Sequence, residues 1–291
     1  MRRAFTQVGL ETLRSDERAA LLLCDIGVYG FREALHEFPA RALNLGILEQ
    51  ATVGVAAGMA KAGLIPIVHT IAPFLVERAL EQIKIDLAYQ QLPAKLVSVG
   101  ASVDYAALGP THHCPGDIAE LGVVPEVELI VPGTSDEFTA LFRQSFSQPT
   151  CTYFRLSEVE NTCSEHVEIG EPTLLQQGTE LTVLSVGPVK DLVASAIGDL
   201  DVSHVYLTSL RPLNADSLAP HVVSRRVVIV EPVYTGTVGG ILMALFPNEF
   251  LEILSIGFPR EFRRHYGKRE EHMEAVGLTT ERVRQIVLSA L

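Results

Sequence analysis

The sequence predicts an α/β protein made of two doubly wound domains, each built on a largely parallel sheet. Short apolar runs alternate with segments of helical spacing, which is the pattern of strands joined by crossover helices. A polar stretch at 157–171, rich in Glu, Ser and Thr, interrupts this alternation and suits an exposed interdomain linker. We therefore expect one domain over residues 1–165 and a second, smaller one over residues 172–291.

The apolar runs place the expected elements in chain order. In the first half they predict strands at 20–24, 65–69, 95–99, 128–131 and 152–155. Helices are predicted at 50–62, 75–89 and 136–147, with Gly63 and Pro66 ending the first of them. The second half predicts strands at 181–186, 202–207 and 227–230, and helices at 189–198, 238–246 and 280–291.

The charge balance narrows the classes of partner. The chain has 23 Lys and Arg residues against 35 Asp and Glu, a formal net charge of -12. Because such a charge repels nucleic-acid backbones and anionic lipids, neither a nucleic acid nor a membrane partner is expected. No signal peptide or spanning helix is recognisable, and we expect a cytoplasmic protein. The four cysteines, at 24, 114, 151 and 163, show no paired spacing and are expected to be free and buried.

The most informative single residue is Glu49. It stands at the start of an apolar, small-residue helix at 51–60, where burying a carboxylate is costly unless a partner binds it. From the carboxylate alone, a structural explanation stays open: Glu49 could cap its helix or pair with an arginine.

Residues 44–50 read Asn-Leu-Gly-Ile-Leu-Glu-Gln, and together with Gly54, Gly58 and the segment 70–82 they resemble the pyrimidine-binding domain of transketolases. Transketolases are thiamine diphosphate enzymes. The resemblance implies that Glu49 hydrogen-bonds a ring nitrogen of the cofactor's aminopyrimidine and so activates the cofactor. The chemistry fits, since the cofactor needs from the protein only orientation and one proton-sharing group in a dry site.

The same resemblance assigns cofactor contacts to the segment 70–82. Phe74 stands where an aromatic ring stacks on the pyrimidine, and Ile71 stands where a second phenylalanine is common. Arg78 belongs to the same segment and is expected to contact the cofactor. Without the match, Phe74 and Ile71 would be interpreted as core side chains.

A second motif at 109–113, Gly-Pro-Thr-His-His, resembles a loop of transketolases and 1-deoxyxylulose-5-phosphate synthases. The resemblance implies that His112 is catalytic and contacts the donor ketose, and it makes His113 a second substrate candidate. A metal site at His112, His113 and Cys114 is not expected, because adjacent residues point in different directions and no matching ligand pair follows. An ordinary surface loop remains an alternative for this segment.

Three positions depart from the transketolase pattern. Leu108 replaces an aspartate, Gly100 replaces a common histidine, and Glu158 stands where an arginine usually binds the acceptor's phosphate. A carboxylate repels a phosphate. A neighbour such as Arg155, Arg78 or Arg41 could compensate each change alone, and Arg41 and Arg155 are the arginines that we expect to bind substrate. The departures predict an atypical acceptor and leave open whether it carries a phosphate.

The second half resembles the transketolase C-terminal domain at 208–213, 237–240 and 277–279, so the resemblance covers nearly the whole chain. The Gly-Asp-Gly segment of the family's diphosphate domain is missing. The resemblance therefore implies the C-terminal section of a split transketolase that uses thiamine diphosphate. A separate N-terminal-section subunit would supply the diphosphate site and the Mg²⁺ ligands, with two copies of each chain.

The expected activity is transfer of a two-carbon ketol unit from a ketose donor to an atypical acceptor. Three alternatives stay open: a synthase of the deoxyxylulose-phosphate type, the beta subunit of a 2-oxoacid dehydrogenase, and a non-catalytic partner subunit. The motif at 109–113 speaks against the dehydrogenase subunit, and the presence of both Glu49 and Phe74 speaks against a non-catalytic chain.

Overall fold

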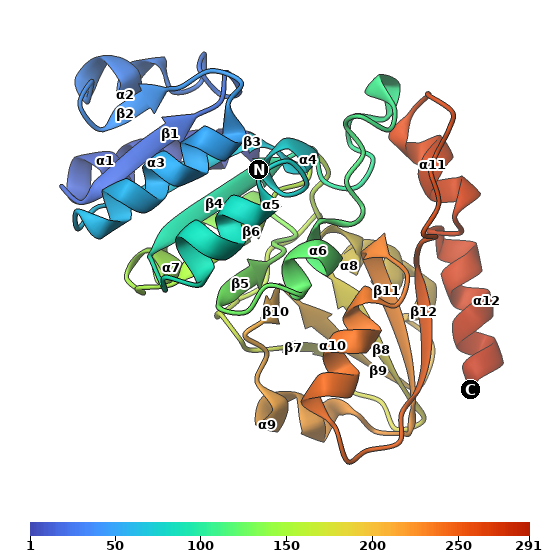
Figure 1. The fold of residues 1–291 in the computed structure, drawn as a ribbon. Helices are drawn as coiled ribbons and strands as arrows, with labels where there is room; N and C mark the ends of the chain where they lie inside the picture. Colours follow the sequence, from blue (N-terminus) through green and yellow to red (C-terminus); the bar gives the residue numbers. More distant parts are fainter.

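A computed structural model describes all 291 residues and shows two sheets with helices packed around them (Figure 1). The first sheet has seven strands in the order β10-β5-β6-β4-β3-β1-β2, and the second has five in the order β12-β11-β8-β9-β7. All pairs are parallel except β10 with β5 and β7 with β9. The predicted α/β fold class is therefore confirmed.

Every strand expected from the sequence is present. The first sheet contains β1 (Ala19–Leu23), β2 (Ala42–Asn44), β3 (Ile65–Ile71), β4 (Ala94–Val99), β5 (Val127–Ile130), β6 (Cys151–Arg155) and β10 (Ser209–Arg211). The second contains β7 (Thr173–Gln176), β8 (Leu181–Val186), β9 (Val202–Leu207), β11 (Arg226–Tyr234) and β12 (Glu252–Phe258). Four of these strands, β2, β7, β10 and β12, were not expected.

One predicted helix is wrong, and five of the observed helices, those at 2–15, 32–37, 117–122, 215–218 and 269–275, were not expected. The observed helices are α1 (Arg2–Ser15), α2 (Arg32–Glu37), α3 (Glu49–Lys61), α4 (Ala72–Leu75), α5 (Leu80–Gln82), α6 (Asp117–Gly122), α7 (Ser135–Phe146), α8 (Lys190–Ile197), α9 (Ala215–Leu218), α10 (Thr237–Leu245), α11 (Arg269–Ala275) and α12 (Thr280–Ala290). The continuous helix predicted at 75–89 is wrong. A turn that buries Val76 and Ala79 separates α4 from α5, and the chain continues as the π-helix η1 (Ile83–Ala88).

The core follows from the two-residue period of the buried strands. All five residues of β1 are buried, because helices cover both faces of the sheet. Leu21 and Leu23 pack in one cluster with Phe5 of α1 and Phe138 of α7, whereas Leu22 packs in another with Val53 of α3. Alternate side chains of one strand thus fix helices on opposite faces.

The two halves of the chain are connected more closely than a plain linker predicts. Most of the segment 157–171 is at least partly exposed, as expected, but four of its residues are buried, Val167 and Asn161 among them. The Asn161 amide donates to the Gly187 carbonyl at 3.1 Å. Strand β10 lies late in the chain and pairs with β5 of the first sheet. The domain boundaries given above remain a prediction.

Two smaller expectations have different outcomes. Cys24, Cys114 and Cys151 are free and buried as predicted, but Cys163 is exposed, because it lies in the polar stretch that borders the second sheet. None of the helices is long and apolar enough to cross a membrane.

Candidate active site

The candidate residues gather where the strands of the first sheet end. Glu49 follows β2, Phe74 follows β3, and the loop 100–116 follows β4. Since β2, β3 and β4 belong to one run of parallel strands, their carboxyl ends meet at one edge, which is the usual place for a ligand site in such sheets. The green loop at 100–116 extends from this edge toward α11 (Figure 1).

Glu49 is the first residue of α3, where the partial positive charge of the helix N-terminus favours a carboxylate. Its side chain is 1% exposed. Oε2 accepts a hydrogen bond from Arg78 Nη1 at 2.6 Å, and Oε1 accepts one from Thr70 Oγ1 at 3.3 Å. The structural alternative for Glu49, pairing with an arginine, is therefore present in this structure.

Arg78 joins Glu49 to the other candidates. Its guanidinium lies over the Phe74 ring, 4.3 Å from the ring centroid, and is 40% exposed. The rings of Phe74 and His112 meet edge-on with centroids 5.2 Å apart. His112 Nδ1 in turn lies 2.9 Å from Thr111 Oγ1. The structure thus brings Glu49, Arg78, Phe74 and His112 into one continuous row.

Tyr105 and Ile71 pack around Gly100, beside this row of residues. Gly100 has φ +78, and a side chain there would place its Cβ 2.5 Å from Cε2 of Tyr105. The Tyr105 ring therefore fills the space beside the site that a larger residue at position 100 would need. Ile71 is buried in the core cluster at the end of β3, where it forms an apolar wall beneath this glycine.

His113 points away from His112. It is buried, its Nε2 lies 3.4 Å from the Ala106 carbonyl, and burial lowers the pKa of its imidazole. Its ring meets that of His272 on α11 edge-on at 5.2 Å. The two adjacent histidines therefore serve different surroundings, and the structure does not place His113 in the row with Glu49.

Arg41 is bound to the opposite edge of the sheet. It precedes β2, whereas Glu49 follows it, and its guanidinium donates to backbone oxygens near the start of β1, including Ala19 at 2.7 Å. The predicted substrate-binding role of Arg41 is not supported by this geometry.

Arg155 is enclosed. Its side chain is 1% exposed, and its Nε donates to Asp117 Oδ2 at 2.8 Å. Its Nη2 donates to Ser102 Oγ and to the carbonyls of Cys114 and Pro232. With these donors already bonded inside the protein, the predicted substrate-binding role of Arg155 is not supported either.

Comparison with known proteins agrees with this geometry. Residues 1–162, more than half of the chain, match the family model described as the transketolase pyrimidine-binding domain. The chain belongs to the transketolase family.

Three relatives match most of this transketolase-family chain, and two of them do so over most of their own length. The "uncharacterized 33.6 kDa protein in fasciation locus" of Rhodococcoides fascians is 40% identical over 91% of this chain and 86% of its own length. A protein of Phocaeicola vulgatus, named as one of the subunits of an apulose-4-phosphate transketolase, is 30% identical over 96% of this chain and 94% of its own length. A "1-deoxy-D-xylulose-5-phosphate synthase" of Rhodopirellula baltica is 26% identical over 96% of this chain but only 46% of its own length.

A solved structure shares the fold. The chain described as "split gene transketolase, inactive beta4 tetramer" superposes with a TM-score of 0.87 over 100% of this chain and 97% of its own, at 24% sequence identity. The transketolase-type arrangement of both sheets therefore extends over the whole chain.

The transketolase-family chain also has a cation that the sequence analysis missed. Arg2, at the start of α1, lines a cavity of about 300 Å³ together with Tyr105, Ser157 and Glu158. Burial raises the pKa of the Glu158 carboxyl, and nearby Arg2 opposes that rise. The only sign of this cation in the sequence is a pair of arginines at the start of an amphipathic segment, 2–15. Arg2 lies near the site because α1 packs along β1.

Proposed function

We propose that this chain is the C-terminal-section subunit of a two-component, thiamine-diphosphate-dependent transketolase located in the cytoplasm. In this proposal it transfers a two-carbon ketol unit from a ketose donor to an atypical acceptor. The observation that carries it is the buried Glu49 carboxylate, which lies at the strand-end edge beside Phe74 and is held by a half-exposed arginine. The Phocaeicola relative is named as a single subunit of a transketolase, which supports the two-component organisation.

The residues at this edge fit the pyrimidine end of thiamine diphosphate. Glu49 offers a carboxylate in dry surroundings, Phe74 offers a ring face, and Ile71 offers an aliphatic wall. When bound, thiamine diphosphate supplies the carbon acid whose anion carries the two-carbon unit. The protein's own task is then to bind, orient and exchange a proton.

Each residue of the row has a distinct task in this proposal. Glu49 would share a proton with a ring nitrogen of the bound pyrimidine, and Arg78 would hold its carboxylate in place. Phe74 stacks on the ring. His112 Nδ1 is paired with the Thr111 hydroxyl, so Nε2 is left to hydrogen-bond an oxygen of the donor ketose. Thr70, buried in β3, fixes the orientation of Glu49.

The diphosphate and its Mg²⁺ are proposed to be held by the N-terminal-section subunit, in an assembly with two copies of each chain. The sequence has no Gly-Asp-Gly segment of the family type. The solved split-gene relative, whose beta chains are described as an inactive tetramer, supports the need for a partner.

The surroundings of the three residues that depart from the transketolase pattern support the proposal of an atypical acceptor. Leu108 is exposed, Gly100 is covered by Tyr105, and Glu158 lines the cavity beside Arg2. We propose that Arg2, in place of Arg41 or Arg155, provides the cation for an acidic group on the acceptor. Relatives named for apulose-4-phosphate and for 6-deoxy-6-sulfo-D-fructose are consistent with unusual sugars.

Reconstitution tests this function. We expect calorimetry to detect tight thiamine diphosphate binding, in the presence of Mg²⁺, only after the chain is mixed with the N-terminal-section subunit from the same organism. The mixture should transfer ketol units without releasing carbon dioxide from pyruvate. Tight binding by this chain alone would contradict the two-component proposal. Carbon dioxide release would favour the synthase or the dehydrogenase subunit, and a mixture without turnover would favour the non-catalytic alternative.

A further inference from the structure

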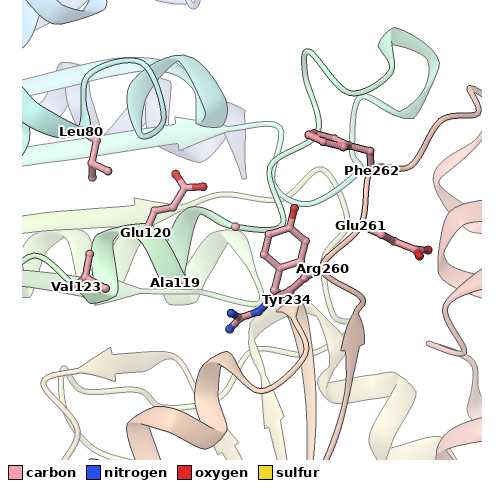
Figure 2. A pocket seen from close by; sticks show the side chains of 9 residues that line it. Leu80, Ala119, Glu120, Val123, Tyr234, Arg260, Glu261 and Phe262 are labelled. Carbon is pink, nitrogen blue, oxygen red and sulfur yellow. The ribbon is translucent and has the colours of Figure 1, made fainter.

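A cavity of about 470 Å³ lies between the two halves of the chain (Figure 2), and no residue of the candidate catalytic row lines it. One wall is formed by Leu80 of α5 and by residues 116–123 around α6. The other wall is formed by Tyr234 at the end of β11 and by the segment 260–262. Its volume is that of a site for a small molecule.

Of the two acids drawn in Figure 2, Glu120 projects from α6 into the space between the two walls. Its Oε2 is buried without a hydrogen-bond partner. Burial raises the pKa of the Glu120 carboxyl, and the nearby carboxyl groups of Glu77 and Asp117 raise it further, to about 7. Asp117 is neutralised by Arg155, whereas no salt bridge neutralises Glu120.

The charged groups on the facing elements leave Glu120 without a counter-ion. Arg260 lines the cavity, but its guanidinium points away from Glu120 toward α10 (Figure 2). Glu261 points outward from the rim, and the Tyr234 hydroxyl stands between the two walls (Figure 2). A partly buried carboxylate without a partner is costly, and a cation that enters the cavity removes that cost.

The remaining walls suit an organic cation better than a hydrated metal ion. Tyr234 and Phe262 offer aromatic rings, and Phe262 is 77% exposed. Leu80, Ala119 and Val123 offer aliphatic surface. Rings attract ammonium and guanidinium groups, and a carbon chain gains from the aliphatic wall.

We propose that this cavity binds a small alkylammonium or guanidinium compound, with the charged group against Glu120 and the carbon chain against Leu80 and Val123. A ligand bound in this cavity affects the candidate active site through the loop 100–116. The backbone N–H of Tyr234 donates to the Pro115 carbonyl at 2.9 Å, and Gly116 lines the cavity four residues after His112. The ligand therefore holds this loop against the second half of the chain.

Calorimetry with n-butylammonium chloride on the full chain tests the proposal. We expect saturable binding at pH 8, with n-butanol, which has the same carbon chain but no charge, binding at least about tenfold more weakly. Glu120→Gln keeps the shape of the side chain and should weaken butylammonium by about tenfold or more. Glu261→Gln, a rim glutamate that points outward, is the matched control and should leave the affinity unchanged.

The pH dependence adds an independent measurement. Since the pKa of Glu120 is about 7, the wild-type affinity should rise about tenfold between pH 6 and pH 8, and this rise should be absent in Glu120→Gln.

Three outcomes would overturn the proposal: absence of saturable binding, equal binding of n-butanol, or an unchanged affinity in Glu120→Gln. Repeating the titration on the two-subunit complex distinguishes a free ligand from a protein side chain. If the partner subunit displaces butylammonium and Glu120→Gln weakens assembly, the cation belongs to a partner lysine or arginine, and the small-molecule site is overturned.

Discussion

Two arginine-carboxylate pairs lie near the strand ends of the first sheet, and they differ in how far solvent reaches them. Arg78 Nη1 lies 2.6 Å from Glu49 Oε2, and Arg155 Nε lies 2.8 Å from Asp117 Oδ2. In the first pair the arginine is 40% exposed, whereas in the second both side chains are almost completely buried. The chemistry is the same, but only the first pair is open to a ligand.

The closed pair is surrounded by further protein contacts. Asp117 also accepts from the Tyr153 hydroxyl at 2.7 Å, and Arg155 reaches the Pro232 carbonyl in the second half of the chain. Glu49, by contrast, has only the Thr70 hydroxyl as a further side-chain hydrogen-bond partner, and Arg78 lies over the ring face of Phe74. A buried pair with all its partners is structural, whereas a pair with one open side can exchange a partner for a ligand.

The largest expected effect tests the open pair. Glu49→Gln keeps the side-chain shape but removes the carboxylate, so ketol transfer by the reconstituted enzyme should fall by about 100- to 10,000-fold. The urea midpoint should hardly change, because the amide oxygen can accept from Arg78 and the amide N–H can donate to the Thr70 hydroxyl. Glu37→Gln, which disrupts an exposed pair with Arg14, is the control and should retain activity. Full activity of Glu49→Gln would remove Glu49 from catalysis.

The next effect tests the closed pair. Arg155→Met leaves Asp117 buried without its cation and should lower the free energy of unfolding by about 3 to 5 kcal/mol. Urea denaturation followed by circular dichroism measures this. The control is Arg284→Met, whose pair with Asp199 is exposed and screened by solvent, so this variant should lose much less stability. If both variants lose the same stability, burial does not distinguish the pairs.

A smaller effect is expected at Arg78, because solvent reaches its side of the open pair. Arg78→Met should lower the free energy of unfolding by about 1 to 3 kcal/mol, since Glu49 keeps only Thr70 as a partner. Adding Glu49→Gln should restore much of this loss, because the double variant has no unpaired charge. A double variant as unstable as the sum of both single variants would show that the pair is not coupled.

Most of the fold could be predicted because the central strands are buried on both faces and therefore appear as apolar runs. The elements that were missed lack this signal. Strands β2 and β10 have three residues each, and β10 finds its partner β5 far away in the sequence. The break after α4 was missed because Val76 and Ala79 fit helical spacing equally well.

The site was predictable only where a motif fixes local geometry. Glu49, Phe74 and His112 lie in short motifs, and the structure brings them together. The enclosure of Arg155 could not be predicted, because its partner Asp117 is 38 residues away and a sequence does not reveal which charges meet. Arg2 was missed for the same reason, since only the packing of α1 brings it to Glu158.

The smallest expected effect concerns Glu120, which lies beside the closed pair but has no cation of its own. Its pKa rises from 4.5 to about 7 on folding, so the folded chain holds this proton more tightly than the unfolded chain. Stability therefore falls as the pH rises from about 4.5 to 7, and the loss is complete above that window.

Glu120→Gln removes this penalty and should be more stable than the wild type at pH 8, but not at pH 4. With allowance for solvent screening at this partly exposed carboxyl, the gain is on the order of 1 kcal/mol. Urea denaturation at both pH values measures it. If Glu120→Gln and the wild type are equally stable at both pH values, a second charge beside Asp117 costs no stability. Arg155 then stabilises both carboxylates.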